Sequence, residues 1–114
     1  MKINNVELKN IDILDYEVAE KWENALERVE GVAKSIEGMK VSESIKTQCN
    51  AIFEVFNTMF GEGTDKKIFG DRVNLMMCLK ALEELVTQVN SQSAEVEKMA
   101  SKYSPNRANR RNKK

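Results

Sequence analysis

Histidine is entirely absent from this chain of 114 residues. Because histidine is the commonest general base and the commonest metal ligand in proteins, catalysis here would have to use carboxylates, lysine, tyrosine or cysteine. No spacing in the sequence brings such groups together. We therefore expect a protein that is not an enzyme, with no catalytic residue and no bound metal or cofactor.

Cysteine is scarce as well, since Cys49 and Cys78 are its only two instances. Both fall on the apolar faces of predicted helices, where a free thiol packs as a small hydrophobe, so we expect reduced core residues. A disulfide or a shared metal is the alternative, but there is no CxxC spacing to favour it.

Long hydrophobic runs are missing too. No apolar run approaches the roughly 20 residues that are needed to cross a bilayer. The N-terminus, Met1 to Asn5, lacks the apolar stretch of a signal peptide. We expect no membrane segment and a location in the cytoplasm.

Acidic residues are absent from the C-terminal end. Residues 104–114 hold five basic residues and no acidic one, so a body of net charge −5 precedes a tail of net charge +5. Pro105 ends helical structure, and with one alanine after it the tail cannot fold alone. The length predicts one domain. We therefore divide the chain into a helical domain, 1–103, and a flexible basic tail, 104–114.

Hydrophobic periodicity predicts three helices, over residues 15–38, 42–61 and 71–103. Asp15 and Ser42 are expected N-caps, and Gly38 and Gly61 are expected C-terminal stops. The predicted fold is mainly α, a three-helix antiparallel bundle. The third helix carries a strict seven-residue repeat, which is typical of coiled-coil packing, through Leu75, Leu79, Leu82, Val86, Val89, Ser93, Val96, Ala100 and Tyr103.

Two segments outside these helices have predictable roles. Residues 1–14 look extended and favour a short β-hairpin, which must pack on the helices or on another copy to be stable. Thr64 is expected to cap a short helical turn that presents Ile68 and Phe69 to the core. The glycines around this turn also suggest a phosphate-binding loop, but a structural linker is favoured because the motif GxxxxGK[ST] is absent.

The second half of the third helix is only weakly apolar. We expect Leu75 to Val89 to pack in the bundle, and Gln92 to Tyr103 to project and become fully ordered against a partner. Methionines are expected to fill the core, except Met99 on this distal segment; an adaptable Met-lined groove for partner helices is the alternative.

The basic tail has three interpretations. Docking on an acidic protein surface, such as the body of another copy, is favoured. A solvated terminus is the second, and contact with nucleic acid is the third, since Arg-rich segments can fold on RNA. Five charges would make nucleic-acid binding weak and strongly salt-dependent, and the tail has no aromatic residue to stack on bases.

Three stretches of the sequence form a recognisable set: Lys46–Ala51 (KTQCNA), Phe60–Thr64 with Ile68–Asp71 (FGEGT and IFGD), and Tyr103–Arg111 (YSPNRANRR). Over most of the chain they resemble a family of small proteins from bacteriophages and prophages of Gram-positive bacteria. Members of that family look like tail assembly chaperones, which are small and helical and are encoded near the tape-measure protein. The resemblance implies an assembly role without catalysis, in which the protein holds a helical tape-measure chain in the host cytoplasm.

The first functional hypothesis is therefore a tail assembly chaperone that captures a helical client and forms homo-oligomers. Two alternatives remain: a small nucleic-acid-binding regulator that acts through the Arg-rich tail, and a phage inhibitor of a host defence protein that acts through the acidic helical surface. The predicted partner-binding residues lie on the distal third helix and the tail: Val89, Val96, Met99, Tyr103, Arg107, Arg110 and Arg111.

Overall fold

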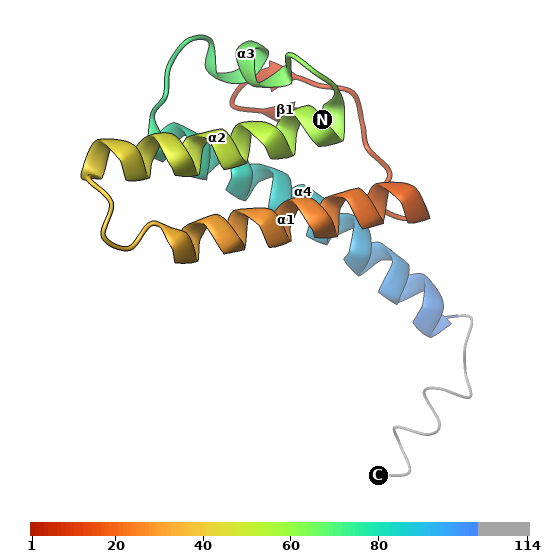
Figure 1. Cartoon of the computed structure of the whole chain (residues 1–114). Coiled ribbons are helices and arrows are strands. Elements are labelled where there is room, and N and C mark those ends of the chain that lie inside the picture. The colour runs from red at the N-terminus through yellow and green to blue at the C-terminus, as the bar shows by residue number, and fades with distance from the viewer. Residues whose placement is uncertain (103–114) are drawn as a thin grey trace.

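The computed structural model describes residues 1–102, which form a short β-hairpin followed by four helices (Figure 1). This arrangement confirms the predicted mainly helical fold with an N-terminal hairpin. Tyr103 and the tail, 104–114, lie outside the described residues. No helix within the described range is long and apolar enough to span a membrane. The elements are β1 (Lys2–Ile3), β2 (Val6–Glu7), α1 (Tyr16–Ser35), α2 (Val41–Phe60), α3 (Thr64–Phe69) and α4 (Leu75–Lys102).

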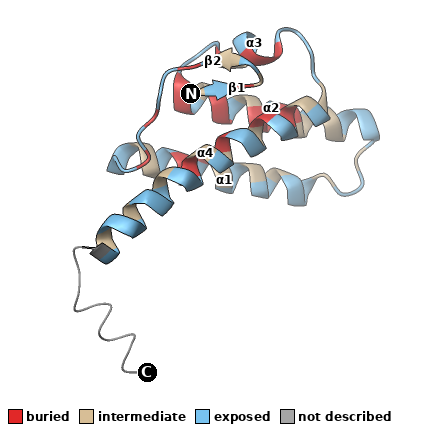
Figure 2. Ribbon diagram, turned by 180° about the vertical axis from the view of Figure 1, so that it is seen from behind, coloured by how far each residue is buried: buried red, intermediate tan, exposed pale blue. Residues whose placement is uncertain are grey.

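Helix α2 is the centre of the molecule. It runs antiparallel to α1, and α3 and α4 also pack against it (Figure 1). The ring of Phe56 is fully buried, with its centroid 6.2 Å from that of Phe60 and 5.9 Å from that of Phe69 on α3. Buried residues accordingly concentrate on α2 and on the adjoining half of α4 (Figure 2).

The short helix α3 confirms the predicted turn between the second and third long helices. Ile68 and Phe69 are both buried, as expected. The predicted cap is wrong, however: Gly63 is the N-cap, in the left-handed conformation with φ +91°, and Thr64 is the first helical residue. The Thr64 hydroxyl instead donates a hydrogen bond of 2.6 Å to the carbonyl oxygen of Gly61.

Helix boundaries follow the local caps. Asp15 is the N-cap of α1, although its side chain makes no capping hydrogen bond, and Gly61 ends α2 as predicted. Ser42 is not a cap, because α2 begins one residue before it. The last helix begins at Leu75 instead of residue 71, since the Asn74 side-chain oxygen accepts a hydrogen bond of 3.0 Å from the Met77 N–H. An asparagine in this position satisfies a backbone donor that the helix leaves free.

The N-terminal segment pairs within its own chain. Ile3 pairs with Val6 in the antiparallel hairpin, and Asn4 and Asn5 form its turn with φ values of 52° and 64°. Positive φ at both positions defines a type I′ turn, which matches the twist of paired strands. Leu14 is 58% exposed, but four other apolar side chains of the segment are buried in the core: Ile3, Leu8, Ile11 and Ile13.

Side chains on one face of α4 hold this N-terminal segment in place. Glu84, Gln88 and Gln92 are spaced by four residues, so they lie in a row along the helix. The Asn4 N–H donates to the Glu84 carboxylate at 3.3 Å, and the Gln88 amide donates to the Lys2 carbonyl at 3.1 Å. Gln92 contacts the backbone of Ile11 and Ile13. We call residues 1–14 the strap.

The buried face of α4 is turned relative to the predicted one. Of the predicted seam within the described residues, only Val89 is buried; Leu79 and Ser93 are exposed, and the others are half-buried: Leu75, Leu82, Val86, Val96 and Ala100. The strap and α2 together bury the neighbouring face, and α4 crosses behind α1 at an oblique angle, unlike a coiled coil (Figure 1). The fully buried residues are Cys78, Ala81, Leu85 and Val89.

Candidate functional site

The rotation of α4 leaves one flank of this helix apolar and accessible. The side chains of Met76 and Leu79 are 61% and 44% exposed. At 100° per residue they point roughly 160° and 100° away from Cys78, which faces the core. Leu75, Leu82 and Val86 lie between this exposed flank and the core and are half-buried. We call the five residues Leu75, Met76, Leu79, Leu82 and Val86 the apolar band.

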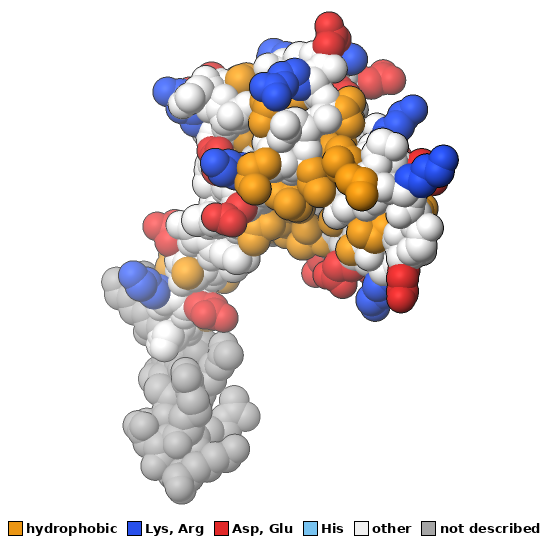
Figure 3. Space-filling view, turned by 90° about the vertical axis from the view of Figure 1, so that its left-hand side faces the viewer, with side chains coloured by type: hydrophobic (Ala, Val, Ile, Leu, Met, Phe, Trp, Pro, Cys, Tyr) orange, Lys and Arg blue, Asp and Glu red, His pale blue; other side chains and the backbone are white. Residues whose placement is uncertain are grey.

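Other helix ends add hydrophobic residues beside the apolar band. The C-terminal end of α1, the start of α2 and the start of α4 lie at one end of the molecule (Figure 1). Half-exposed Val32 and Ile36 come from this part of α1. Seen from this end, hydrophobic side chains gather in a continuous patch between charged margins (Figure 3). Contiguous apolar surface of this kind is typical of a protein interaction site.

The margins of the apolar band are charged. Lys80 and Glu83 are exposed on α4 next to Leu79, and Arg72 lies exposed just before the helix. An apolar centre with a polar margin is the usual composition of a protein–protein interface. The first half of α4 carries more apolar residues than one buried face of a helix can hold. This surplus is the signal in the sequence that indicates the site.

The predicted partner-binding residues differ in how exposed the structure shows them to be. Val89 is 2% exposed and belongs to the core, so its assignment as a partner contact is wrong; it lies on the face of α4 that α2 and the strap cover. Val96 is half-buried, and Met99 is 60% exposed. Tyr103, Arg107, Arg110 and Arg111 lie outside the described residues, so their prediction stands untested.

The methionines also separate into two groups. Met59 is buried on α2 and Met77 is half-buried, which agrees with the expected core role. Met76 is exposed, and its core role is therefore wrong, because α4 is rotated. Met76 instead fits the alternative of an adaptable methionine at a binding surface.

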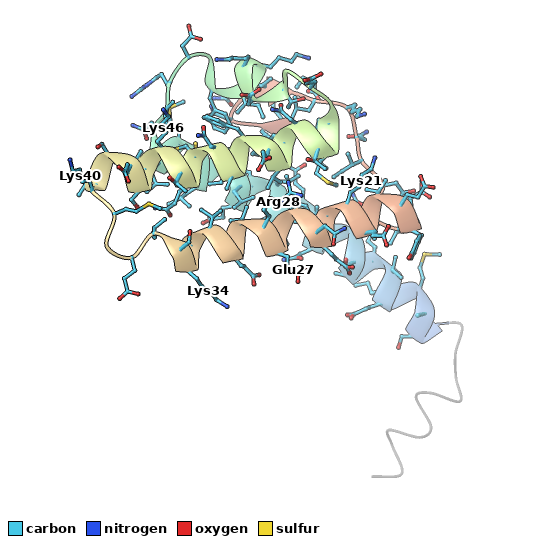
Figure 4. All side chains as sticks on the ribbon, viewed as in Figure 1. Lys21, Glu27, Arg28, Lys34, Lys40 and Lys46 are labelled. Carbon is cyan, nitrogen blue, oxygen red and sulfur yellow. The ribbon has the colours of Figure 1, made fainter. Side chains whose placement is uncertain are left out.

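The outer face of α1 is strongly acidic. From Asp12 to Glu30 the chain holds seven acidic and two basic residues, and all seven acidic side chains are exposed. Glu27 points away from α2, whereas Arg28 points towards it (Figure 4) and forms an ion pair with Glu54 at 3.6 Å. Both partners of that pair are more than half exposed, so it contributes little to stability.

The two cysteines face each other across the α2–α4 contact. Cys49 and Cys78 are free and completely buried, which confirms their predicted role as reduced core residues. Burial, followed by the hydrogen bond to Cys49, raises the pKa of the Cys78 thiol from 9.0 to about 12. Because the thiolate is the reactive form, Cys78 stays protonated and inert at neutral pH.

Polar chemistry elsewhere in residues 1–102 is structural. Within this range no group of three or more His, Cys, Asp or Glu side chains converges as a metal site. Every buried side-chain nitrogen and oxygen in the same range has a hydrogen-bond partner.

Comparison with known proteins identifies one protein family that matches this chain. Searches of curated proteins and of solved structures gave no match. A family model described as a family of unknown function, DUF6673, matches residues 4–114 and so covers the strap from Asn4 onwards, all the helices and the basic tail. The chain therefore belongs to the DUF6673 family.

Proposed function

We propose that this protein is a non-enzymatic phage assembly chaperone that holds a helical structural protein, such as the tape-measure protein, on its apolar band. The observation that carries the proposal is the exposure of Met76 and Leu79 on a helix whose opposite side is well packed. Amphipathic client helices dock on such surfaces through anchors spaced by three or four residues. Met76, Leu79, Leu82 and Val86 have this spacing.

The proposed client contact lies nearer the N-terminal end of α4 than the contact predicted from the sequence. The distal contact predicted from the sequence included Val89, which is buried. The apolar band supplies more apolar surface than Val96 and Met99 alone. The flexible thioether of Met76 adapts to successive turns of a repetitive client.

The class of client comes from the resemblance to phage tail assembly chaperones. A tape-measure chain is long and helical, and exposed apolar stripes on it would aggregate before assembly. Interfaces that bury less than about 1,200 Å² are usually transient. A band of five side chains is of this smaller kind, so each contact is released easily when tail-tube subunits replace the chaperone.

The test is co-expression with a phage tape-measure protein. We expect the soluble fraction of the client to rise when the chaperone is present. The double variant Met76→Gln, Leu79→Gln should lose this effect, because both changes remove apolar anchors from exposed positions and leave the core intact.

The matched control is Tyr16→Gln, which replaces a side chain that is 76% exposed at the start of α1. It should keep the client soluble. Equal client solubility with the double variant and with the wild type would show that the apolar band is not the client site. Recovery of nucleic acid instead of the client with the wild-type protein would favour the regulator alternative.

A further inference from the structure

The distal part of α4, residues 90–102, extends beyond the packed body, and we call it the arm (Figure 1). From residue 90 to residue 101 no side chain is fully buried. Val96, Met99 and Ala100 nevertheless form an apolar stripe with helical spacing. Isolated helices of this length are marginal in water, so the stripe would gain stability from a second apolar surface.

The apolar band of the same molecule cannot be that surface. Leu79 and Met99 lie on one continuous helix, twenty residues apart, and a helix rises 1.5 Å per residue, which separates them by about 30 Å. A continuous helix cannot fold back to cover its own beginning. An arm that packs on an apolar band must therefore pack on the band of another copy.

Charge favours another copy of this chain as the partner. The arm leads directly into the tail of net charge +5, and the segment from Asp12 to Glu30 has net charge −5. Residues 103–114 would reach at most about 40 Å when extended, and α1 is about 30 Å long. A tail that starts beside the apolar band is thus long enough to follow the acidic face of α1, whose C-terminal end lies at the same end of the molecule as the start of α4 (Figure 1).

We infer that the arm of one copy packs on the apolar band of a second copy, while its basic tail follows the acidic face of the second copy's α1. The inference rests on the proposed function in one respect, namely that the band accepts a helix. The contact joins two different surfaces, so one copy can use its arm and its band on two different neighbours, and copies linked in this way are joined head to tail. The arm then shields the band until a client helix displaces it.

The decisive experiment mixes two full-length variants, each defective in one half of the contact. Leu79→Gln weakens the band, and Met99→Gln weakens the arm. Sedimentation velocity of the wild type over a range of concentrations should show reversible self-association that weakens with added salt. Loss of one buried apolar anchor should weaken self-association of each variant roughly tenfold.

The most specific prediction concerns association in a mixture of the two variants. The intact arm of Leu79→Gln fits the intact band of Met99→Gln, so we expect the mixture to form a 1:1 complex that is roughly tenfold tighter than the self-association of either variant. Thr58→Gln, at an exposed position on α2, should associate as the wild type does. A monomeric wild type at all concentrations, or undiminished association of Met99→Gln, would overturn the inference.

Client binding separates this inference from the proposed function. In the co-expression assay Met99→Gln should still keep the tape-measure protein soluble, because its apolar band is intact. A wild type that self-associates through the arm but leaves the client insoluble would refute only the proposed function. A wild type that keeps the client soluble but remains monomeric would refute only the head-to-tail contact.

Discussion

The side chain of Gln92 makes two hydrogen bonds to the strap, and one of them links it to Ile13. The Ile13 N–H donates to the Gln92 Oε1 atom at 2.9 Å, and the Gln92 Nε2 atom donates to the carbonyl oxygen of Ile11 at 3.0 Å. Gln92 is thus paired with the backbone of an extended segment as a neighbouring strand would be. It lies where α4 leaves the body, so it marks the boundary between the packed core and the arm.

Replacing Gln92 should therefore destabilise the protein more than replacing its neighbour in the same row. Gln92→Ala leaves a partly buried N–H and a partly buried C=O without partners, which should cost about 1 kcal/mol or more in the free energy of unfolding. Gln88 makes a single, exposed hydrogen bond, so Gln88→Ala should cost less than about 1 kcal/mol. Urea denaturation of both variants measures the difference. Equal losses would mean that the end of the strap is not anchored by Gln92.

The turn of the strap gives a second prediction. Asn5 has φ 64°, a conformation that a β-branched residue rarely adopts. Asn5→Val should lower the free energy of unfolding by roughly 1–2 kcal/mol through left-handed backbone strain. Asn5→Gly tolerates this conformation and should retain stability close to that of the wild type. If thermal unfolding gave the same midpoint for both variants, the hairpin turn would not have the type I′ geometry.

The buried thiol of Cys78 predicts a pH dependence. Its folded pKa of about 12 lies above its ordinary value of 9.0. The folded state therefore keeps a proton that the unfolded state loses, and stability falls as pH rises. The contribution is fully present below pH 9.0 and is lost between pH 9.0 and about 12, with a slope of at most about 1.4 kcal/mol per pH unit.

The comparison that isolates this effect uses Cys78→Ala. Lysine and tyrosine titrate in the same range, but they do so in both proteins, so their effects cancel in the difference. The free energy of unfolding of the variant should start lower, because a buried side chain is shortened, and then decline less steeply with pH. Parallel curves for the two proteins would contradict the assignment of a raised pKa to Cys78.

Local signals were sufficient to predict most of the elements. Gly61 and the apolar periodicity placed α2 to within a residue at either end, and Ile68 with Phe69 identified the buried turn that became α3. These features depend on backbone conformation and on side chains close in sequence. The start of α4 was placed too early because Asp71 and Asn74 are both good caps, and the sequence alone did not rank them.

The orientation of α4 could not be predicted in the same way. This helix carries two apolar stripes that meet at Val89, one through Leu75, Leu79, Leu82 and Val86, the other through Cys78, Ala81 and Leu85. Both have helical spacing, so periodicity favoured the stripe with the larger side chains. The choice was made by tertiary contacts, because the strap needs the row of Glu84, Gln88 and Gln92 beside it. Leu75, Leu82 and Val86 pack only partly against the core, and Leu79 and the neighbouring Met76 are exposed, so the apolar band remains accessible.

Two leucines on α4 test this orientation directly. Leu85 is completely buried and Leu79 is 44% exposed, although the seven-residue repeat places Leu79 in the seam. Leu85→Ala should lower the free energy of unfolding by about 2–5 kcal/mol, because it removes buried methyl groups and leaves a cavity. Leu79→Ala opens no cavity and should cost less than about 1 kcal/mol, as is usual for surface changes. Chemical denaturation at a concentration low enough to suppress self-association measures both. A larger loss for Leu79 than for Leu85 would restore the predicted seam and place the apolar band in the core, where no client could reach it.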